Sequence, residues 1–292
     1  MPTLHNLTST YIAIIMVVIG TVGNILSLVV LCRKRLRTMN IGLYMIALCL
    51  NDLLVLYTSL FNNHVMPVDI SLVYIFENNC SFSRFFIHFF REISSWITVI
   101  ITVHRMFAVF RPLSTRARIL TGYKPQIIII VIMIAILGSV NIVYSRYFYF
   151  ENGRCVTPSK TVTVFFASVM YSFFPATILI SCNVIIVFTL CRRSIAGNAS
   201  QSTSQVNNHT VYMVMAINIL FLICTLPSSV ALALSQGSKI SNSAKSFLIL
   251  LCSVNNVFNF LLYILAGRLF RDEMKSMLKR KRRPSTFTIM SS

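Results

Sequence analysis

Seven long apolar stretches constrain what this chain can fold into. They lie at roughly residues 11–32, 41–61, 82–110, 126–145, 161–191, 210–235 and 243–266. Each is long enough to cross the hydrocarbon core of a bilayer as an α-helix, which takes about 20 residues. The strands of a closed barrel, the other structure that satisfies its backbone hydrogen bonds in lipid, need only about 10 residues. The sequence therefore predicts an all-α membrane protein, a seven-transmembrane helix bundle.

The charged residues are few and unevenly placed. Only 11% of the 292 residues are charged, whereas a soluble protein has about 25%. The net charge is +19, but the basic residues gather between the apolar stretches and form no single face, so nucleic acid is not an expected partner. Most Lys and Arg residues lie in alternate connections and in the C-terminal tail. The positive-inside rule then places the N-terminus outside and the tail in the cytoplasm of a plasma-membrane protein.

The chain is expected to form one membrane unit with short ends. The predicted parts are an extracellular N-terminus at 1–10, the seven-transmembrane domain at 11–266, an amphipathic cytoplasmic helix at 267–279 and a basic cytoplasmic tail at 280–292. In the amphipathic helix, the residues expected to face membrane lipid are Leu269, Phe270, Met274, Met277 and Leu278. Arg271 and Lys275 would then face anionic headgroups.

Cysteines and a glycosylation motif fit this topology. Of eight cysteines, only Cys80 and Cys155 are predicted on the outer side, where disulfides persist, so we expect them to pair; the alternative is two free thiols. Asn6 begins an Asn-Leu-Thr sequon on the same side. Before Cys155, an aromatic run at 147–150 is followed by Asn-Gly, which predicts a β-hairpin. An aromatic belt at the membrane interface is the alternative.

Short motifs recur along the seven stretches in a fixed order. They are Gly23-Asn24, Leu48 with Asp52, Cys80, His104-Arg105-Met106, Pro112-Leu113, Pro175, Phe221-x-x-Cys224-x-x-Pro227 and Asn259-Phe260-Leu261-Leu262-Tyr263. In order and spacing the chain resembles the rhodopsin-like (class A) G protein-coupled receptors over nearly its whole length, and most resembles their peptide receptors. It departs from the family where His104 replaces Asp, Thr225 replaces Trp, Phe260 replaces Pro and Asn183 replaces Tyr.

The resemblance implies roles for particular residues. Those expected in activation and coupling to a heterotrimeric G protein are His104, Arg105, Leu113, Asn183, Phe221, Pro227, Asn259 and Tyr263. Asp52, expected to interact with Asn24, Ser94, Asn255 and Asn259, would bind sodium as a modulator through Asp52, Ser94 and Asn255; the alternative is an ion-free hydrogen-bond network. In the family an Asp beside Arg105 restrains it. Because His104 cannot do so as an anion, we expect measurable ligand-independent signalling.

Polar residues of the third stretch indicate where a ligand binds. Arg91, Ser94, Ser95, Thr98, Thr102 and Arg105 recur at spacings of three or four and form one polar stripe. By resemblance, the ligand pocket is expected at Ile87, His88, Arg91, Thr225, Ser228, Ser229 and Ile249. Ile87 stands where amine receptors have Asp, which argues against an amine ligand. Arg91 favours an anionic or carbonyl-rich ligand, unless it pairs internally with Glu92 or with backbone.

The combined prediction is a plasma-membrane receptor that binds an extracellular ligand, a neuropeptide before others, and activates heterotrimeric G proteins. A chemosensory receptor for a small, acidic molecule is the alternative within the same fold. A transporter or channel, the alternative of another class, would show inverted repeats and broken helices, which the sequence lacks. No nucleophile–base pair is visible in the sequence, so the protein is not expected to be an enzyme, and no cofactor beyond the sodium ion is expected.

Overall fold

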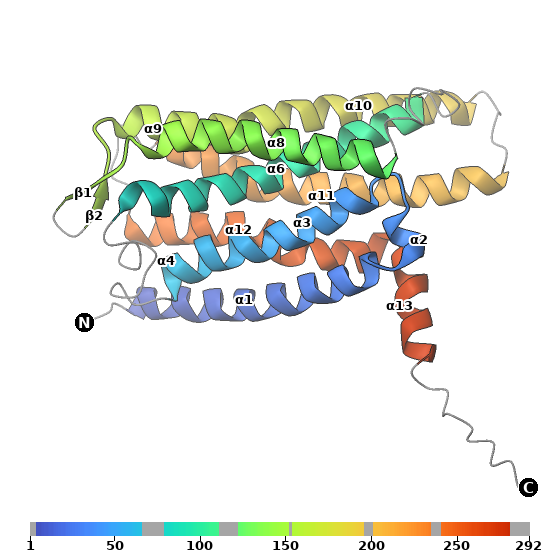
Figure 1. Cartoon of the computed structure of the whole chain (residues 1–292), viewed down its shortest axis with the longest axis horizontal. Helices are drawn as coiled ribbons and strands as arrows, with labels where there is room; N and C mark the ends of the chain where they lie inside the picture. The colour runs from blue at the N-terminus through green and yellow to red at the C-terminus, as the bar shows by residue number, and fades with distance from the viewer. Residues whose placement is uncertain are drawn as a thin grey trace, which may run out of the picture.

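The computed structural model describes residues 4–65, 79–110, 122–151, 154–195, 201–234 and 241–280. Within them, long helices lie side by side in one bundle (Figure 1). The first half of the bundle contains α1 (Leu4–Leu31), the short α2 (Lys34–Arg37), α3 (Gly42–Val55), which continues through η1 (Leu56–Phe61) and α4 (Asn62–His64), α6 (Cys80–Phe110) and α8 (Tyr123–Ser145).

The second half begins with a small hairpin and ends with a helix that turns away from the bundle. Its elements are β1 (Tyr149–Glu151), β2 (Arg154–Val156), α9 (Lys160–Ser168), η3 (Val169–Phe173), α10 (Phe174–Ile195), α11 (Gln201–Leu234), α12 (Asn242–Ala266) and α13 (Arg268–Arg280). The hairpin and α13 lie at opposite ends of the bundle, which are called here the hairpin end and the α13 end (Figure 1). Seven helices among the described residues are long and apolar enough to span a membrane, which confirms the predicted architecture.

The surface of the bundle is apolar, unlike that of a soluble protein. Large apolar side chains such as Val22, Val143 and Phe188 are exposed, as lipid-facing residues should be. Polar residues lie in the interior among buried apolar ones, and Asp52 and Asn218 are completely buried there. Because a polar group facing hydrocarbon is costly, polar side chains in a membrane protein face the bundle interior and one another. This arrangement places the chemistry of the protein between the helices.

The fifth membrane-spanning helix changes its winding beside a proline. Pro175 lacks the N–H that would bond the carbonyl of Tyr171 in an α-helix. The turn before it, η3, is wound as a π-helix. The indole N–H of Trp96 on α6 donates to the carbonyl of Met170 (3.2 Å). The proline and the only tryptophan of the chain therefore fix η3 against α6, and with it the position of Tyr171.

α1 and α12 pack closely because one residue between them has no side chain. A Cβ atom added to Gly23 would overlap the ring of Phe260, which stands at the position of the family's proline. Without a hydrophobic driving force in lipid, helices associate through such close approach at small residues. Gly23 is thus required by the bulk of Phe260.

The substitution Gly23→Ala is expected to lower the free energy of unfolding by about 1–3 kcal/mol, because the extra methyl group overpacks the contact with Phe260. The measurement is thermal unfolding of the protein purified in detergent. Gly138→Ala is the matched control, since its added Cβ would meet Phe89 at an ordinary 3.6 Å. Equal unfolding temperatures for the two variants would contradict the argument.

Candidate functional site

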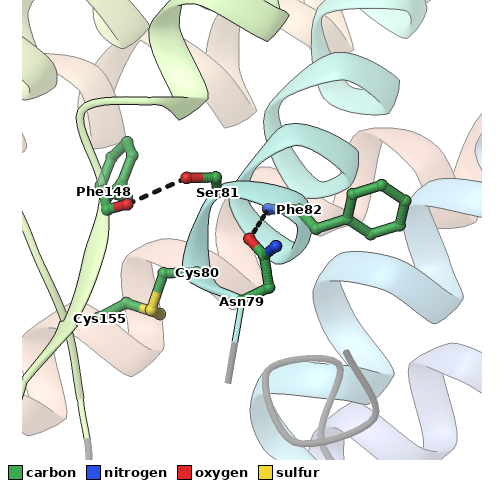
Figure 2. Close-up of a disulfide and its surroundings, with 6 residues drawn as sticks. All are labelled: Asn79, Cys80, Ser81, Phe82, Phe148 and Cys155. Atoms are coloured by element: carbon green, nitrogen blue, oxygen red, sulfur yellow. Dashed lines mark hydrogen bonds between the residues drawn. A yellow bond between two sulfur atoms is a disulfide. The ribbon is translucent and has the colours of Figure 1, made fainter. Parts of the chain in front are cut away.

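The hairpin end is tied to the start of α6 by a disulfide. β1 and β2 pair antiparallel with Phe150 opposite Cys155, and Cys155 is bonded to Cys80, the first residue of α6. The hydroxyl of Ser81 donates to the carbonyl of Phe148 (3.1 Å), so a hydrogen bond supports the covalent link (Figure 2). The side chain of Asn79 accepts from the backbone N–H of Phe82 (3.1 Å) (Figure 2). The predicted hairpin and disulfide are confirmed; the Asn-Gly turn at 152–153 lies outside the described residues.

The aromatic run before Cys155 divides between two faces. Phe148 packs on α6, with its ring centroid 6.2 Å from that of His88 and 5.6 Å from Cζ of Arg84. Tyr147 and Tyr149 are instead exposed. Tyr147 lies in the turn that follows α8, and Tyr149 begins β1. The run therefore anchors the hairpin through Phe148 and presents its tyrosines outward.

Between the helices lies a partly open cavity of about 250 Å³. It is lined by His88, Arg91, Glu92, Ala167, Ser168, Tyr171, Ser228, Ser229, Leu248, Ile249 and Cys252. These residues come from α6, α9, η3, α11 and α12. Of the predicted pocket residues, Ile87 and Thr225 are not among them. Ile87 lies on α6 one turn before Arg91 and is buried. The hydroxyl of Thr225 donates to the Phe221 carbonyl (2.8 Å) and accepts from Ser172 (3.4 Å).

Arg91 and Glu92, adjacent in sequence, have different partners. Cζ of Arg91 lies 4.5 Å from the centroid of the Tyr171 ring, within the range of a cation–π interaction. Glu92 is 1% exposed, and its Oε2 accepts from the side-chain amide of Asn141 on α8 (2.7 Å). Among the described residues, the ion pairs are those of Arg33 and Arg35 with Glu273, and none joins Arg91 to Glu92. Both residues contribute to the cavity wall.

Asp52 is the centre of a second polar cluster, in the middle of the bundle. Its Oδ1 accepts from the Ser94 hydroxyl (2.7 Å) and from the Asn256 amide (2.7 Å), and its Oδ2 accepts from the Asn259 amide (2.8 Å). The amide of Asn24 donates to the backbone carbonyl of Asn256 (3.0 Å), which adds α1 to the network. The cluster therefore joins α1, α3, α6 and α12.

One member of this cluster differs from the prediction. Asn255 was expected beside Asp52, but the hydrogen bond comes from Asn256. Asn259 is three residues from Asn256 and four from Asn255, so helical spacing allows either one beside it. The rotation of α12 in the bundle brings Asn256 to Asp52. The side-chain oxygen of Asn255 is buried and has no hydrogen-bond partner within the described structure.

Toward the α13 end, the predicted polar stripe of α6 continues into a chain of hydrogen bonds. The stripe residues Ser94, Ser95, Thr98, Thr102 and Arg105 are all buried. The hydroxyl of Thr102 donates to Oδ1 of Asn218 on α11 (3.0 Å). The amide of Asn218 in turn donates to Oδ1 of Asn183 on α10 (3.0 Å). Thr102, Asn218 and Asn183, named here the amide chain, connect three helices.

Arg105 and its neighbour His104 point to different partners. Arg105 is buried, and its Nε has no hydrogen-bond partner among the described residues. Nε2 of His104 lies 3.1 Å from the hydroxyl of Tyr44 on α3, a hydrogen bond in which either group can donate. His104 therefore joins α6 to α3 and provides no anion for Arg105. Leu113, the other coupling residue predicted nearby, lies outside the described residues, and so does the side chain of Asn6.

The sequence of this chain matches one known protein family. A family described as 7 transmembrane receptor (rhodopsin family) matches residues 23–263, which include every cluster described above. The chain belongs to this family. It is thus a G protein-coupled receptor, a multi-pass membrane protein whose partners include an extracellular ligand and a G protein. A search of the curated proteins finds no match to the sequence.

Beyond the matched region of the receptor, α13 is docked to the bundle. Glu273 is buried and pairs with Nε of Arg33 (2.8 Å) and with Arg35 (3.6 Å) near α2. Phe270 is buried against Tyr263, with ring centroids 5.8 Å apart. Phe270 was predicted to face lipid, and so were Leu269, Met274 and Met277, which pack in the same cluster. The prediction was wrong for Phe270, which is buried, whereas Leu269, Met274 and Met277 are only half-buried and Leu278 is exposed.

Several residues that make contacts in these clusters were not predicted from the sequence. They are Tyr44, Asn141, Tyr171, Asn218, Asn256 and Glu273. Asn141 and Asn218 carried a usable signal, because an amide in the middle of an apolar stretch needs a partner. The partner of Asn141 could not be predicted from residue spacing, since Asn141 on α8 donates to Glu92 on α6. Tyr44 and Tyr171 carried no signal beyond their aromatic character.

Proposed function

We propose that the receptor lies in the plasma membrane with its hairpin end outside and binds a short neuropeptide there. At the α13 end it promotes nucleotide exchange on a heterotrimeric G protein. The basic α2 and α13 lie at the end opposite the hairpin, which supports this orientation by the positive-inside rule (Figure 1). The observation that carries the ligand assignment is the cavity wall containing Arg91, because a guanidinium binds carbonyl and carboxylate oxygens.

A small acidic molecule is the second candidate ligand. The cavity, about 250 Å³, is smaller than the roughly 300–1,000 Å³ of most ligand pockets. It would hold one small molecule, or only the terminal residue of a peptide whose remainder lies against the hairpin. Both candidates use Arg91 in the same way.

The test is G protein activation in cells that express the full chain. One set of cells receives a library of short synthetic peptides, and another receives a panel of small carboxylic acids. The proposal expects responses to peptides, with a loss of response in Arg91→Ala at equal surface expression. Responses to the acids alone would favour the chemosensory alternative.

The cluster around Asp52 suits a sodium ion. A hard cation takes oxygen ligands. Asp52 supplies a carboxylate and Ser94 a hydroxyl, and the buried side-chain oxygen of Asn259 has no hydrogen-bond partner within the described structure. We propose that sodium binds at these oxygens and stabilises the inactive receptor. The neighbouring amide on α12 is that of Asn256, where Asn255 was expected.

Sodium is therefore expected to raise the unfolding temperature of the purified receptor, because an ion that binds only the folded state stabilises it by mass action. Asp52→Asn removes the charge that binds the ion and should abolish this response. Thermal unfolding is measured as sodium replaces a large organic cation at fixed ionic strength. An equal response in the wild type and the variant would leave an ion-free hydrogen-bond network.

A further inference from the structure

A carboxyl group and a side-chain amide meet deep between α6 and α8. Oε2 of Glu92 accepts from Nδ2 of Asn141 (2.7 Å), and both residues are buried, Glu92 with 1% of its surface exposed and Asn141 with none. Nδ2 also donates to the carbonyl of Leu137, one turn earlier on α8 (2.9 Å). Because only an N–H can donate to that carbonyl, this second bond settles which end of the amide is the nitrogen.

Two oxygens of this pair have no donor. Oε1 of Glu92 and Oδ1 of Asn141 are both buried and form no hydrogen bond within the described structure. When the carboxyl group is ionised, both atoms are acceptors, so they cannot bond to each other. A buried acceptor without a donor is costly, since it loses its hydration without replacement. The ionised form of Glu92 therefore leaves two unsatisfied acceptors at one contact.

No cation forms an ion pair with Glu92 in the described part of the chain. Its neighbour Arg91 makes a cation–π contact with Tyr171, and the ion pairs of that part are those of Glu273 with two arginines at the α13 end. An unpaired charge between membrane-spanning helices is costly, and a carboxyl group avoids that cost by binding a proton. A proton on Oε1 of Glu92 removes the charge and converts this oxygen from an acceptor into a donor.

We propose that Glu92 holds a proton on Oε1 and donates it to Oδ1 of Asn141. The carboxylic acid and the amide then bond along both edges, with Nδ2 donating to Oε2 and Oε1 donating to Oδ1. One proton taken from solvent satisfies both oxygens that lack a donor and leaves the pair neutral. The pair is thus a proton-binding site that fastens α6 to α8, and it does not depend on which ligand the cavity binds.

Infrared spectroscopy of the purified receptor tests this proposal directly. The full chain is solubilised at neutral pH in a detergent that contains no carbonyl group, and the spectrum of Glu92→Gln is subtracted from that of the wild type. We expect the carbonyl band of a protonated carboxylic acid, shifted in heavy water, and no band of an ionised carboxylate. Glu273→Gln is the matched control, because Glu273 is ion-paired with Arg33 and Arg35 and should contribute a carboxylate band.

A second measurement needs no variant. The chain contains four glutamates, which are Glu77, Glu92, Glu151 and Glu273. Cell-free synthesis with glutamate that carries a heavy carbon isotope in its side-chain carboxyl group shifts the infrared bands of these residues and leaves those of the aspartates unchanged. A shifted acid band is expected in the labelled wild-type receptor, because Glu92 is protonated.

Thermal unfolding of the same proteins measures what the proton contributes to the contact. Gln carries a donor and an acceptor as a neutral acid does, so Glu92→Gln is expected to unfold within about 2 °C of the wild type. Leu has neither group and leaves the buried amide of Asn141 without its partner. Glu92→Leu should therefore unfold at a temperature lower by about 4 °C or more.

Three results would overturn the proposal. One is a carboxylate band for Glu92 like that of the Glu273 control, and another is the lack of an acid band in the labelled wild type. The third is a Glu92→Gln protein that fails to fold or unfolds at a clearly lower temperature, because the amide reproduces both hydrogen bonds of the neutral acid. An acid band for Glu92 together with an unchanged unfolding temperature in Glu92→Gln would support it.

Discussion

Replacing Cys80 by serine is expected to remove most of the receptor from the cell surface. The disulfide to Cys155 closes a segment of 75 residues and is supported by the hydrogen bond from Ser81 to Phe148. Removing a native disulfide from small secreted domains costs about 2–5 kcal/mol. Without the bond, the hairpin would lose its covalent link to α6 and would depend on noncovalent contacts such as those of Phe148.

The measurement is surface labelling of an N-terminal epitope, compared with total protein. The double variant Cys80→Ser with Cys155→Ser should lose no more than either single variant, because all three lack the same bond. Cys32→Ser is the matched control, since Cys32 is a free and exposed cysteine. Wild-type surface levels and ligand response in Cys80→Ser would show that the disulfide is dispensable.

Breaking the amide chain is expected to raise ligand-independent signalling about tenfold. Asn218 accepts from Thr102 and donates to Asn183, so it alone connects the three helices in this chain. Interhelical hydrogen bonds in membranes contribute roughly 0.6 kcal/mol on average and up to about 1.7. Losing two of them in Asn218→Ala removes about 1.2 kcal/mol at the average value and more at the upper one. If the lost bonds restrain the inactive receptor, that is roughly a tenfold change in a two-state ratio.

The wild-type receptor itself is expected to signal measurably without ligand. Among the described residues, no acidic side chain forms an ion pair with Arg105, and its neighbour is His104, which bonds to Tyr44. His104→Asp would place a carboxylate next to Arg105 and should lower this basal signal. Ligand-independent signalling should therefore rise in Asn218→Ala, which removes a restraint, and fall in His104→Asp, which adds one.

Both variants are tested by nucleotide exchange without ligand at matched surface expression. Ser181→Ala is the control on α10, because its hydroxyl bonds within its own helix, to the Thr177 carbonyl. A silent wild type that stays silent in Asn218→Ala would show that another contact restrains α11. If ligand-free nucleotide exchange does not decrease in His104→Asp, another contact restrains Arg105.

Much of the architecture follows from the sequence alone. Backbone groups in lipid must be satisfied within one helix, so each apolar stretch predicted a membrane-spanning helix. The helices α1 and α11 begin earlier than predicted, at Leu4 and Gln201. The pairing of Cys80 with Cys155 followed from topology, since only two cysteines were predicted on the outer side. The polar stripe of α6 followed from helical periodicity, which places residues three and four apart on one face.

The partners of the buried polar groups were decided only by the tertiary structure. Asn255 and Asn256 are the same residue type one position apart, and the rotation of α12 against α3 selected Asn256 for Asp52. Glu92 is hydrogen-bonded to Asn141, and His104 to Tyr44. Each bond joins two different helices, so residue spacing along one helix could not predict it. Phe270 was placed inward by the docking of α13, although its amphipathic pattern fitted a lipid-facing helix equally well. Periodicity determines which residues share a face of a helix, but the rotation and depth of each helix in the bundle determine what that face contacts.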